Sequence, residues 1–180
     1  ERETVPYKGV DAVVDALGVH LRQRDDAELF GLRPKYVGAL TQVFPVLDEI
    51  WSVDTRENAE LEPHEARSLG WAALRDLLTL LGRQWALLVA IDDFQWADLD
   101  SAAILRALTR GPDAPALLLV ISARDELADP ELLAWLDDDD PDEREFRRIE
   151  LGPLPEADAR ELALGLLRAQ TDPSAPIEPG

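Results

Sequence analysis

The sequence contains no cysteine and no methionine, and only two of its 18 basic residues are lysines, Lys8 and Lys35. The lack of cysteine excludes disulfide bonds and thiolate metal sites. It is compatible with a cytoplasmic protein, which is the localisation that we predict. The lack of methionine leaves no initiator residue, so we expect the chain to be one part of a longer protein.

Long apolar runs and an excess of positive charge are also missing. No stretch is long and apolar enough for a membrane span, and the charged start ERETVPYKG lacks the apolar region of a secretory signal. The net charge is -19, which would repel a phosphate backbone, so we predict no direct binding of nucleic acid. Apolar residues make up 46% of the chain, which indicates a globular protein.

Apolar residues at helical spacing predict that the first part of the chain is helical. The expected helices cover about 9–23, 36–47 and 63–82, and they are separated by a polar break at 22–26 and a polar loop at 51–62. Pro45 is expected to kink or end the second helix, because proline cannot donate a backbone hydrogen bond. Gly82 is expected to end the third helix.

From Trp85 onwards the pattern changes to strands that alternate with helices. Strands are predicted at 85–91, 116–122 and 146–151, and helices at about 100–110, at 130–136 and from Pro155 onwards. Asp98 or Asp100 is the expected N-cap of the first of these helices, and 111–115 is an expected turn. The leucines of the last helix, Leu162, Leu166 and Leu167, are expected to pack inward. The alternation predicts an α/β fold with a parallel sheet.

Two adjacent acids follow the first predicted strand. Leu87 to Ile91 is a continuous apolar run, typical of a central parallel strand that is covered on both faces. Asp92 and Asp93 then lie at its carboxyl end, where open α/β sheets place their ligands. Such a pair suits a Mg²⁺-nucleotide site, in which one acid holds the metal and the other orients a water. The alternative is that the two acids only end the strand and begin a turn.

The string LLVAIDDFQWADLDSAAIL, from Leu87 to Leu105, resembles the Walker B segment of AAA-like and STAND-type signal-transduction ATPases. These domains occur in bacterial regulators such as LuxR-type activators and ATPase-fused Ser/Thr kinases. Three further segments resemble parts of the same domains in the same order. They are VPYKGVDAVVDALGVHL (5–21), ALLLVISARDE (116–126) and IELGPLPEADARELALGLL (149–167).

The resemblance implies a partial P-loop NTPase of the ASCE type, with a three-layer α/β/α fold. It implies ATP and Mg²⁺ as cofactors of the parent protein, Asp92 as the metal-side acid and Asp93 as the acid that polarises water. Arg124 would be the sensor 1 group that reaches the γ-phosphate; otherwise it is a surface arginine. The implied divisions are a helical region at 1–84, a sheet core at 85–151, and a lid helix with a frayed tail at 152–180.

The sequence departs from this family in one important respect. A P-loop requires G-x-x-x-x-G-K-[ST], and no such string is present. We therefore expect the chain to begin after the P-loop half of the domain and to have no ATPase activity alone. Its expected partners are that missing half and attached effector domains, and a homodimer is a further option. The alternative functions are a non-catalytic acidic interaction module and a decayed pseudo-ATPase.

Other residue groups give weaker signals. The acids at 137–142 lack the glycine and glutamate spacing of an EF-hand and indicate a solvated loop. His20 and His64 are isolated from other metal ligands. No G-x-S-x-G motif accompanies Ser101 or Ser122, which argues against a hydrolase triad. We expect Trp96 to pack under the helix that follows it rather than to stack on adenine.

Overall fold

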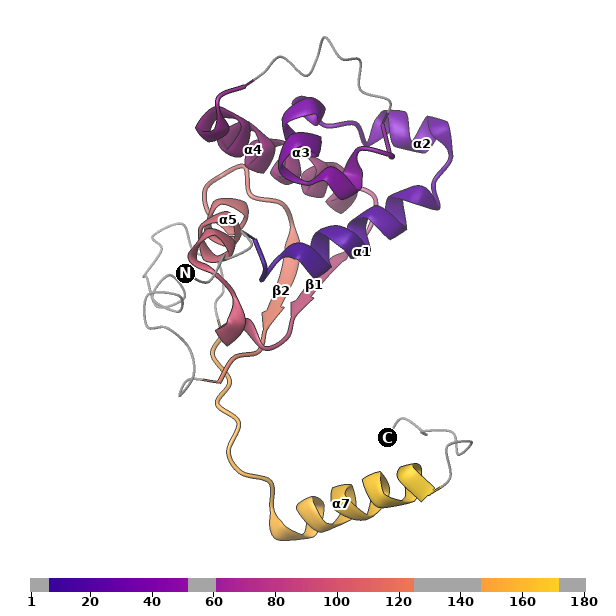
Figure 1. Cartoon of the computed structure of the whole chain (residues 1–180), viewed down its shortest axis with the longest axis vertical. Coiled ribbons are helices and arrows are strands. Elements are labelled where there is room, and N and C mark those ends of the chain that lie inside the picture. Colours follow the sequence, from indigo (N-terminus) through magenta and orange to yellow (C-terminus); the bar gives the residue numbers. More distant parts are fainter. Residues whose placement is uncertain (1–6, 52–60, 125–146, 172–180) are drawn as a thin grey trace. The chain divides into compact units, whose positions relative to one another are not determined.

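The computed structural model describes residues 7–51, 61–124 and 147–171 (Figure 1). The chain divides into two compact units, Glu1–Arg144 and Glu145–Gly180. The boundaries predicted from the sequence, after residues 84 and 151, stay a prediction.

Helices occupy most of the described residues before the sheet, as predicted. They are α1 (Asp11–Arg22), α2 (Asp26–Gly31), α3 (Val37–Val43), the 3-10 turn η1 (Pro45–Leu47) and α4 (Pro63–Gly82). The second predicted helix stops at Val43 and resumes only as a 3-10 turn, because Pro45 has no N–H to donate. The third has the predicted bounds, with Pro63 in its first turn.

Helix α2 was not predicted, because 22–26 was interpreted only as a polar break. Its start is a capping box. The Asp25 side chain accepts from Glu28 N at 2.9 Å, and the Glu28 side chain accepts from Asp25 N at 3.3 Å. This reciprocal pair satisfies two N–H groups that a helix start leaves open. The D-x-x-E spacing was therefore an available signal.

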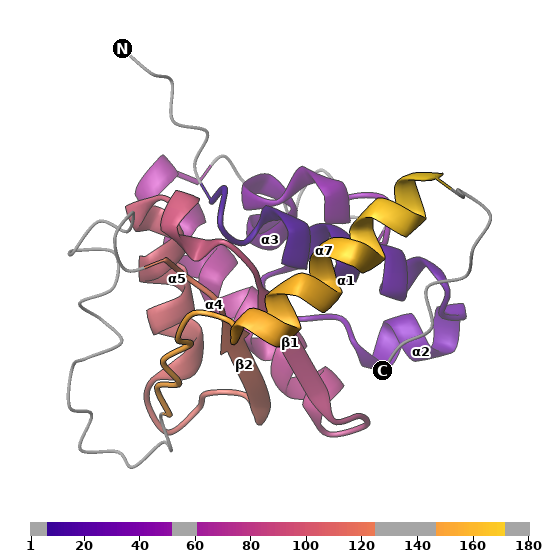
Figure 2. The same cartoon turned by 90° about the horizontal axis from the view of Figure 1, so that it is seen from below.

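The sheet has two parallel strands, β1 (Leu87–Ile91) and β2 (Leu117–Ile121), paired in register from Leu87–Leu117 to Ile91–Ile121. They lie side by side in both views (Figure 1, Figure 2). Helix α5 (Leu99–Thr109) connects them. Since two parallel strands need a crossover, this β-α-β order is the predicted one and gives the first unit an α/β fold.

One continuous core joins the helices to the inner face of the sheet. It contains Leu21, Leu40, Leu47, Leu77, Leu81, Phe94 and Ile104, all almost completely buried. Helix α3 lies against α4 (Figure 1). Gly70 permits this approach, since a Cβ there would lie 2.7 Å from Val43 Cγ2 and 3.0 Å from the Ala39 carbonyl oxygen.

The outer face of the sheet is exposed. Leu88 is 65% exposed and Leu118 61%, and Val120 is also exposed, whereas Leu87, Val89 and Ile91 face the core. The described residues of the first unit therefore do not provide the predicted cover of the second face. A continuous apolar run indicates that both faces avoid water, but it does not supply the element that covers the second face. The three-layer arrangement stays a prediction.

The second unit contains α7 (Glu156–Thr171). Residues 147–151 contain no strand, so the predicted strand at 146–151 is wrong over its described part. A β-strand forms only where a neighbouring strand pairs with its backbone N–H and C=O groups. Within this unit Leu162, Leu166 and Leu167 are exposed, and their predicted inward packing stays a prediction. A single helix has no surface of its own on which to bury an apolar face.

Several predictions fall outside the described residues. They are the loop at 52–60, the helix at 130–136, the acidic segment at 137–142 and the end of the tail. No helix in the described part of the chain has the length and apolarity that crossing a membrane requires.

Candidate functional site

The two strands end at the same level, and their following residues are joined by backbone hydrogen bonds. Ser122 N donates to the Ile91 carbonyl oxygen at 2.9 Å, and Phe94 N donates to the Ser122 carbonyl oxygen at 2.9 Å. The residues after β1 are thereby fixed against the residues after β2. This edge is the carboxyl end of a parallel sheet, the usual place for a ligand site in α/β folds.

The side chain of Asp92 is held by Ser122, the residue that follows the neighbouring strand β2. The Ser122 hydroxyl donates to Asp92 Oδ1. The Asp93 backbone N–H lies 3.1 Å from both Asp92 Oδ1 and the Ser122 oxygen. The Asp92 carboxylate therefore has a fixed position although it is exposed.

Asp93 has a left-handed backbone, with φ 55° and ψ 40°. Non-glycine residues adopt this region infrequently, and aspartate does so more readily than most. The conformation turns the chain into the 3-10 turn η2 (Phe94–Trp96). Phe94 then enters the core, while the Asp93 carboxylate stays exposed at the strand end.

Gln95 connects Asp93 to the residues that follow β2. Its Nε2 donates to Asp93 Oδ1 at 2.8 Å, and its Oε1 accepts from Arg124 N at 3.1 Å. Gln95 is 6% exposed, whereas Asp93 and Arg124 are exposed, so both bonds are partly buried. Only one orientation of the amide satisfies both neighbours, since a carboxylate accepts and a backbone N–H donates.

The three residues predicted for the site are thus brought together. Asp92, Asp93 and Arg124 belong to one hydrogen-bonded cluster that is completed by Gln95 and Ser122. Arg124 takes part through its backbone N–H, and its side chain is exposed. The chemical roles assigned to the three residues stay predictions.

Sequence reasoning missed the contributions of Gln95 and Ser122. Gln95 stands in the string DDFQWAD, but nothing in its spacing indicated a bridge to Arg124. Ser122 was weighed only as part of a hydrolase triad. Trp96 is 59% exposed, so its predicted packing under α5 is wrong; Phe94 fills the core instead. The left-handed turn at Asp93 decides which of the two aromatic residues faces inward.

Asp98 belongs to a separate, structural cluster at the start of α5. Its Oδ1 accepts from Ser101 N at 2.8 Å, which makes Asp98 the N-cap. Its Oδ2 accepts from the Ser101 hydroxyl at 3.0 Å and from Lys8 N at 2.7 Å. Gly9 N donates to the Ser101 oxygen at 2.9 Å. The segment before α1 is therefore attached to the helix that follows the two acids.

The electrostatics near this cluster affect Asp11, in the first turn of α1. Burial, together with the nearby carboxylates of Asp15 and Asp98, raises the pKa of Asp11 above its ordinary value. Removal from water and like charge both disfavour the ionised form.

Asp92 and Asp93 can coordinate a metal ion only if another molecule supplies further ligands. Among residues 7–51, 61–124 and 147–171, no three His, Asp or Glu side chains gather closely enough to hold a metal ion. Mg²⁺ is usually held by one or two carboxylates together with phosphate oxygens and waters. The exposed Asp92–Asp93 pair therefore fits Mg²⁺ that is bound with a phosphate-bearing nucleotide.

Comparison with known proteins identifies the family. No curated protein and no solved structure matched the chain. A family profile described as AAA ATPase domain matches residues 2–121. The match includes Asp92, Asp93 and both strands, and it ends before Ser122 and Arg124. Because this match covers more than half of the chain, the chain belongs to the AAA ATPase domain family.

Proposed function

We propose that this chain is the Walker B and sensor 1 part of a regulatory ATPase, a nucleotide-dependent switch in a larger signalling protein. The observation that carries the proposal is the cluster at the strand ends. Gln95 links the Asp93 carboxylate to the backbone of Arg124, and Ser122 holds Asp92. Such positioning is what phosphoryl transfer requires of the protein, since its catalysis rests mainly on geometry and charge.

Each predicted site residue has a distinct role in this proposal. Asp92, fixed by the Ser122 hydroxyl, holds the metal side of the site, and Asp93, fixed by Gln95, orients and polarises the attacking water. The Arg124 guanidinium pairs with γ-phosphate oxygens, for which its planar fork is suited. ATP with Mg²⁺, when bound, supplies the transferable phosphoryl group and the charge that neutralises it.

The phosphate cradle must come from another segment. Backbone N–H groups and a lysine of a P-loop normally hold the phosphates, and this sequence contains no P-loop string. We therefore propose that the chain alone does not hydrolyse ATP, and that a P-loop segment of the parent protein completes the site. Attached effector domains would then respond to the nucleotide state in the cytoplasm.

The exposed sheet face supports the need for a further partner. Leu88, Leu118 and Val120 form an apolar surface on two parallel strands. Parallel sheets are normally covered on both faces. The missing half of the ATPase domain is the proposed cover; pairing of two copies through this face is the alternative.

The experiment uses the parent protein, with ATP binding and ATP hydrolysis measured separately. Asp93→Asn is expected to lower kcat by about 10²-fold or more while ATP still binds, because the water loses its polarising carboxylate. Asp92→Asn is expected to raise the Mg²⁺ concentration needed for half-maximal activity. Asp113→Asn, an exposed acid in the turn before β2, is the matched control and should leave both measurements unchanged.

A different result would favour the non-catalytic module or the pseudo-ATPase. If the parent binds ATP and hydrolyses it equally well after Asp93→Asn, the acid pair is only a strand end. If the parent neither binds nor hydrolyses ATP, the nucleotide switch is excluded. Robust Mg²⁺-dependent hydrolysis by this chain alone would contradict the requirement for a separate P-loop.

A further inference from the structure

The Gln95 side chain is a buried link between the two strand ends. It is 6% exposed, although the next residue of η2, Trp96, is 59% exposed. Its amide donates to Asp93 Oδ1 at 2.8 Å and accepts from Arg124 N at 3.1 Å. A buried polar group is costly unless it is paired, so the amide is stable only with both partners in place. One rigid, planar group thus spans the residues after β1 and the residues after β2.

The bond from Gln95 occupies only one oxygen of the Asp93 carboxylate. Within the part of the chain that the structure describes, the other oxygen, Oδ2, accepts no hydrogen bond, and Asp93 is exposed. Both oxygens of a carboxylate can accept, so Oδ2 stays accessible to a water molecule. Gln95 therefore orients the acid without blocking the chemistry proposed for it.

The two acids are connected to the end of β2 in different ways. Asp92 accepts directly from the Ser122 hydroxyl, whereas the Asp93 carboxylate reaches Arg124 N through Gln95. A hydrogen bond is lost when its heavy atoms separate beyond about 3.5 Å. A shift of the Arg124 backbone by about 1 Å would therefore break one bond of Gln95 or move its amide. The orientation of the Asp93 carboxylate thus depends on the position of Arg124.

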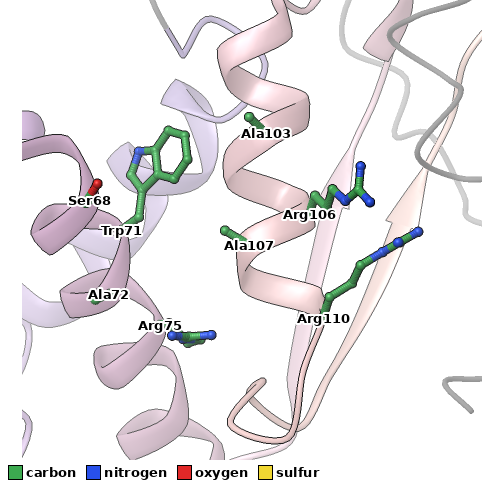
Figure 3. Close-up of a pocket in the computed structure, with 8 residues that line it drawn as sticks. All are labelled: Ser68, Trp71, Ala72, Arg75, Ala103, Arg106, Ala107 and Arg110. Atoms are coloured by element: carbon green, nitrogen blue, oxygen red, sulfur yellow. The ribbon is translucent and has the colours of Figure 1, made fainter. Parts of the chain in front are cut away.

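A groove of 510 Å³ between α4 and α5 is separate from this link. Figure 3 shows the residues that line the groove, and all of them belong to these two helices. None belongs to β1, to β2 or to the residues that follow either strand. A molecule bound in the groove would therefore not touch the Gln95 amide. The link between Asp93 and Arg124 depends on the direct bonds of Gln95.

We propose that Gln95 is a positioning residue that couples Arg124 to Asp93. When the Arg124 guanidinium contacts a γ-phosphate, its backbone is held, and Gln95 fixes the carboxylate that orients the attacking water. When the phosphate leaves, Arg124 regains freedom and Asp93 loses its fixed orientation. The inference rests on the proposed function and adds a regulation of the same site. Since coupling between two positions is reciprocal, loss of the Asp93 carboxylate must also loosen Arg124.

The coupling can be measured by NMR in this chain without nucleotide. Asp93→Gly removes the carboxylate, and glycine adopts the left-handed backbone of this position without strain. We expect this change to shift the Arg124 amide resonance and to raise its hydrogen-exchange rate by about threefold or more. In a Gln95→Met background, Asp93→Gly should cause no further change at Arg124, because methionine fills the space but cannot donate to Asp93.

Two further variants control this measurement. Gln84→Met makes the same substitution at an exposed position in the turn after α4, so Asp93→Gly should keep its full effect on Arg124 in that background. Asp93→Asn keeps an acceptor oxygen for the Gln95 amide and should disturb Arg124 less than Asp93→Gly. The contrast between asparagine and glycine requires no change at Gln95, so the test stays decisive if Gln95→Met does not fold. Thermal melting verifies that each variant is folded.

Kinetics of the parent protein test the consequence for the reaction. Gln95→Met is expected to lower kcat for ATP hydrolysis by about tenfold and to change KM by less than about twofold, because the acid is retained but loses its orientation. The double variant with Asp93→Asn should be no slower than Asp93→Asn alone, since Gln95 acts through that carboxylate. A role of Gln95 in stability alone would instead make the two losses add.

Two results would overturn this inference and leave the proposed ATPase intact. One is an unchanged kcat in Gln95→Met when Asp93→Asn lowers it. The other is an Arg124 amide that does not respond to Asp93→Gly. A wild-type parent that does not hydrolyse ATP would overturn the proposed function, and with it the role of Gln95 in hydrolysis. The coupling between Asp93 and Arg124 would then still be decided by the spectra of this chain.

Discussion

The Gln95 side chain donates to the Asp93 carboxylate across 2.8 Å from a position that is almost completely buried. The amide also accepts from Arg124 N, so one side chain fixes the residues that follow both strands. Asp93 is held in a left-handed conformation at the same point. The exposed Asp93 carboxylate is therefore positioned by the buried Gln95 side chain. Only one orientation of the Gln95 amide can donate to Asp93 and accept from Arg124 N.

Replacement of Gln95 by glutamate should destabilise the protein at neutral pH by about 2–4 kcal/mol, because a buried carboxylate would face Asp93 and could not donate to it. The difference from wild type should shrink in acid, where a protonated glutamate regains a donor. Denaturant unfolding at several pH values measures this. Gln95→Leu is the comparison variant: its cost should vary less with pH, and an identical pH profile for the two would contradict the explanation.

Gly70→Ala should destabilise the first unit by about 1–3 kcal/mol, because the added Cβ would overlap Val43 and the Ala39 carbonyl where α3 packs on α4. Thermal or urea unfolding provides the measurement. Gly31→Ala is the matched control, since no atom lies within 4 Å of its added Cβ. It should be neutral or slightly stabilising because alanine favours the helix. Equal effects at the two positions would show that helix propensity, not packing, determines the result.

Asp98→Ala should cost about 1–3 kcal/mol, because it removes the N-cap of α5 and leaves Lys8 N and Ser101 without their acceptor. Asp100→Ala, two residues along, breaks only the exposed pair with Arg67 and should cost less than about 1 kcal/mol. Chemical unfolding of both variants tests the difference. If Asp100→Ala is the more damaging change, the cap is not the main contribution.

Asp11 should make stability fall as pH rises through its own titration. Its pKa is raised in the folded state by burial and by the carboxylates of Asp15 and Asp98. Its favourable contribution is thus fully present below the ordinary aspartate value of about 4 and is lost as pH rises through the folded value. Asp11→Asn should therefore raise the melting temperature at pH 7 relative to wild type and give no gain near pH 3. A gain that is equal at both pH values would contradict this origin.

Leu118→Lys on the outer face of the sheet should reduce self-association with little loss of stability, because this side chain is already exposed. Light scattering against concentration, together with thermal melting, measures both effects. Val89→Lys is the contrasting variant on the inner face, where the side chain packs against the core, and it should unfold the unit. Unchanged scattering after Leu118→Lys would show that the face does not drive association.

Local patterns in the sequence were sufficient for most of the elements in the first unit. The spacing of apolar residues predicted α1 and α4. Pro45 predicted the end of α3, and Asp98 predicted the start of α5. Such features depend on neighbours a few residues apart, so they can be interpreted without knowledge of distant contacts. The strand predicted at 146–151 is absent over its described part. Strand pairing depends on a partner that is distant in the sequence, which a local pattern does not reveal.

The sequence by itself determined the β-α-β order and the place of Asp92 and Asp93 at a strand end. The tertiary structure alone decided that Gln95 joins Asp93 to Arg124, and that Phe94 rather than Trp96 is buried. The physical reason is that these features depend on the left-handed turn at Asp93 and on contacts between segments about 30 residues apart, which no local periodicity encodes.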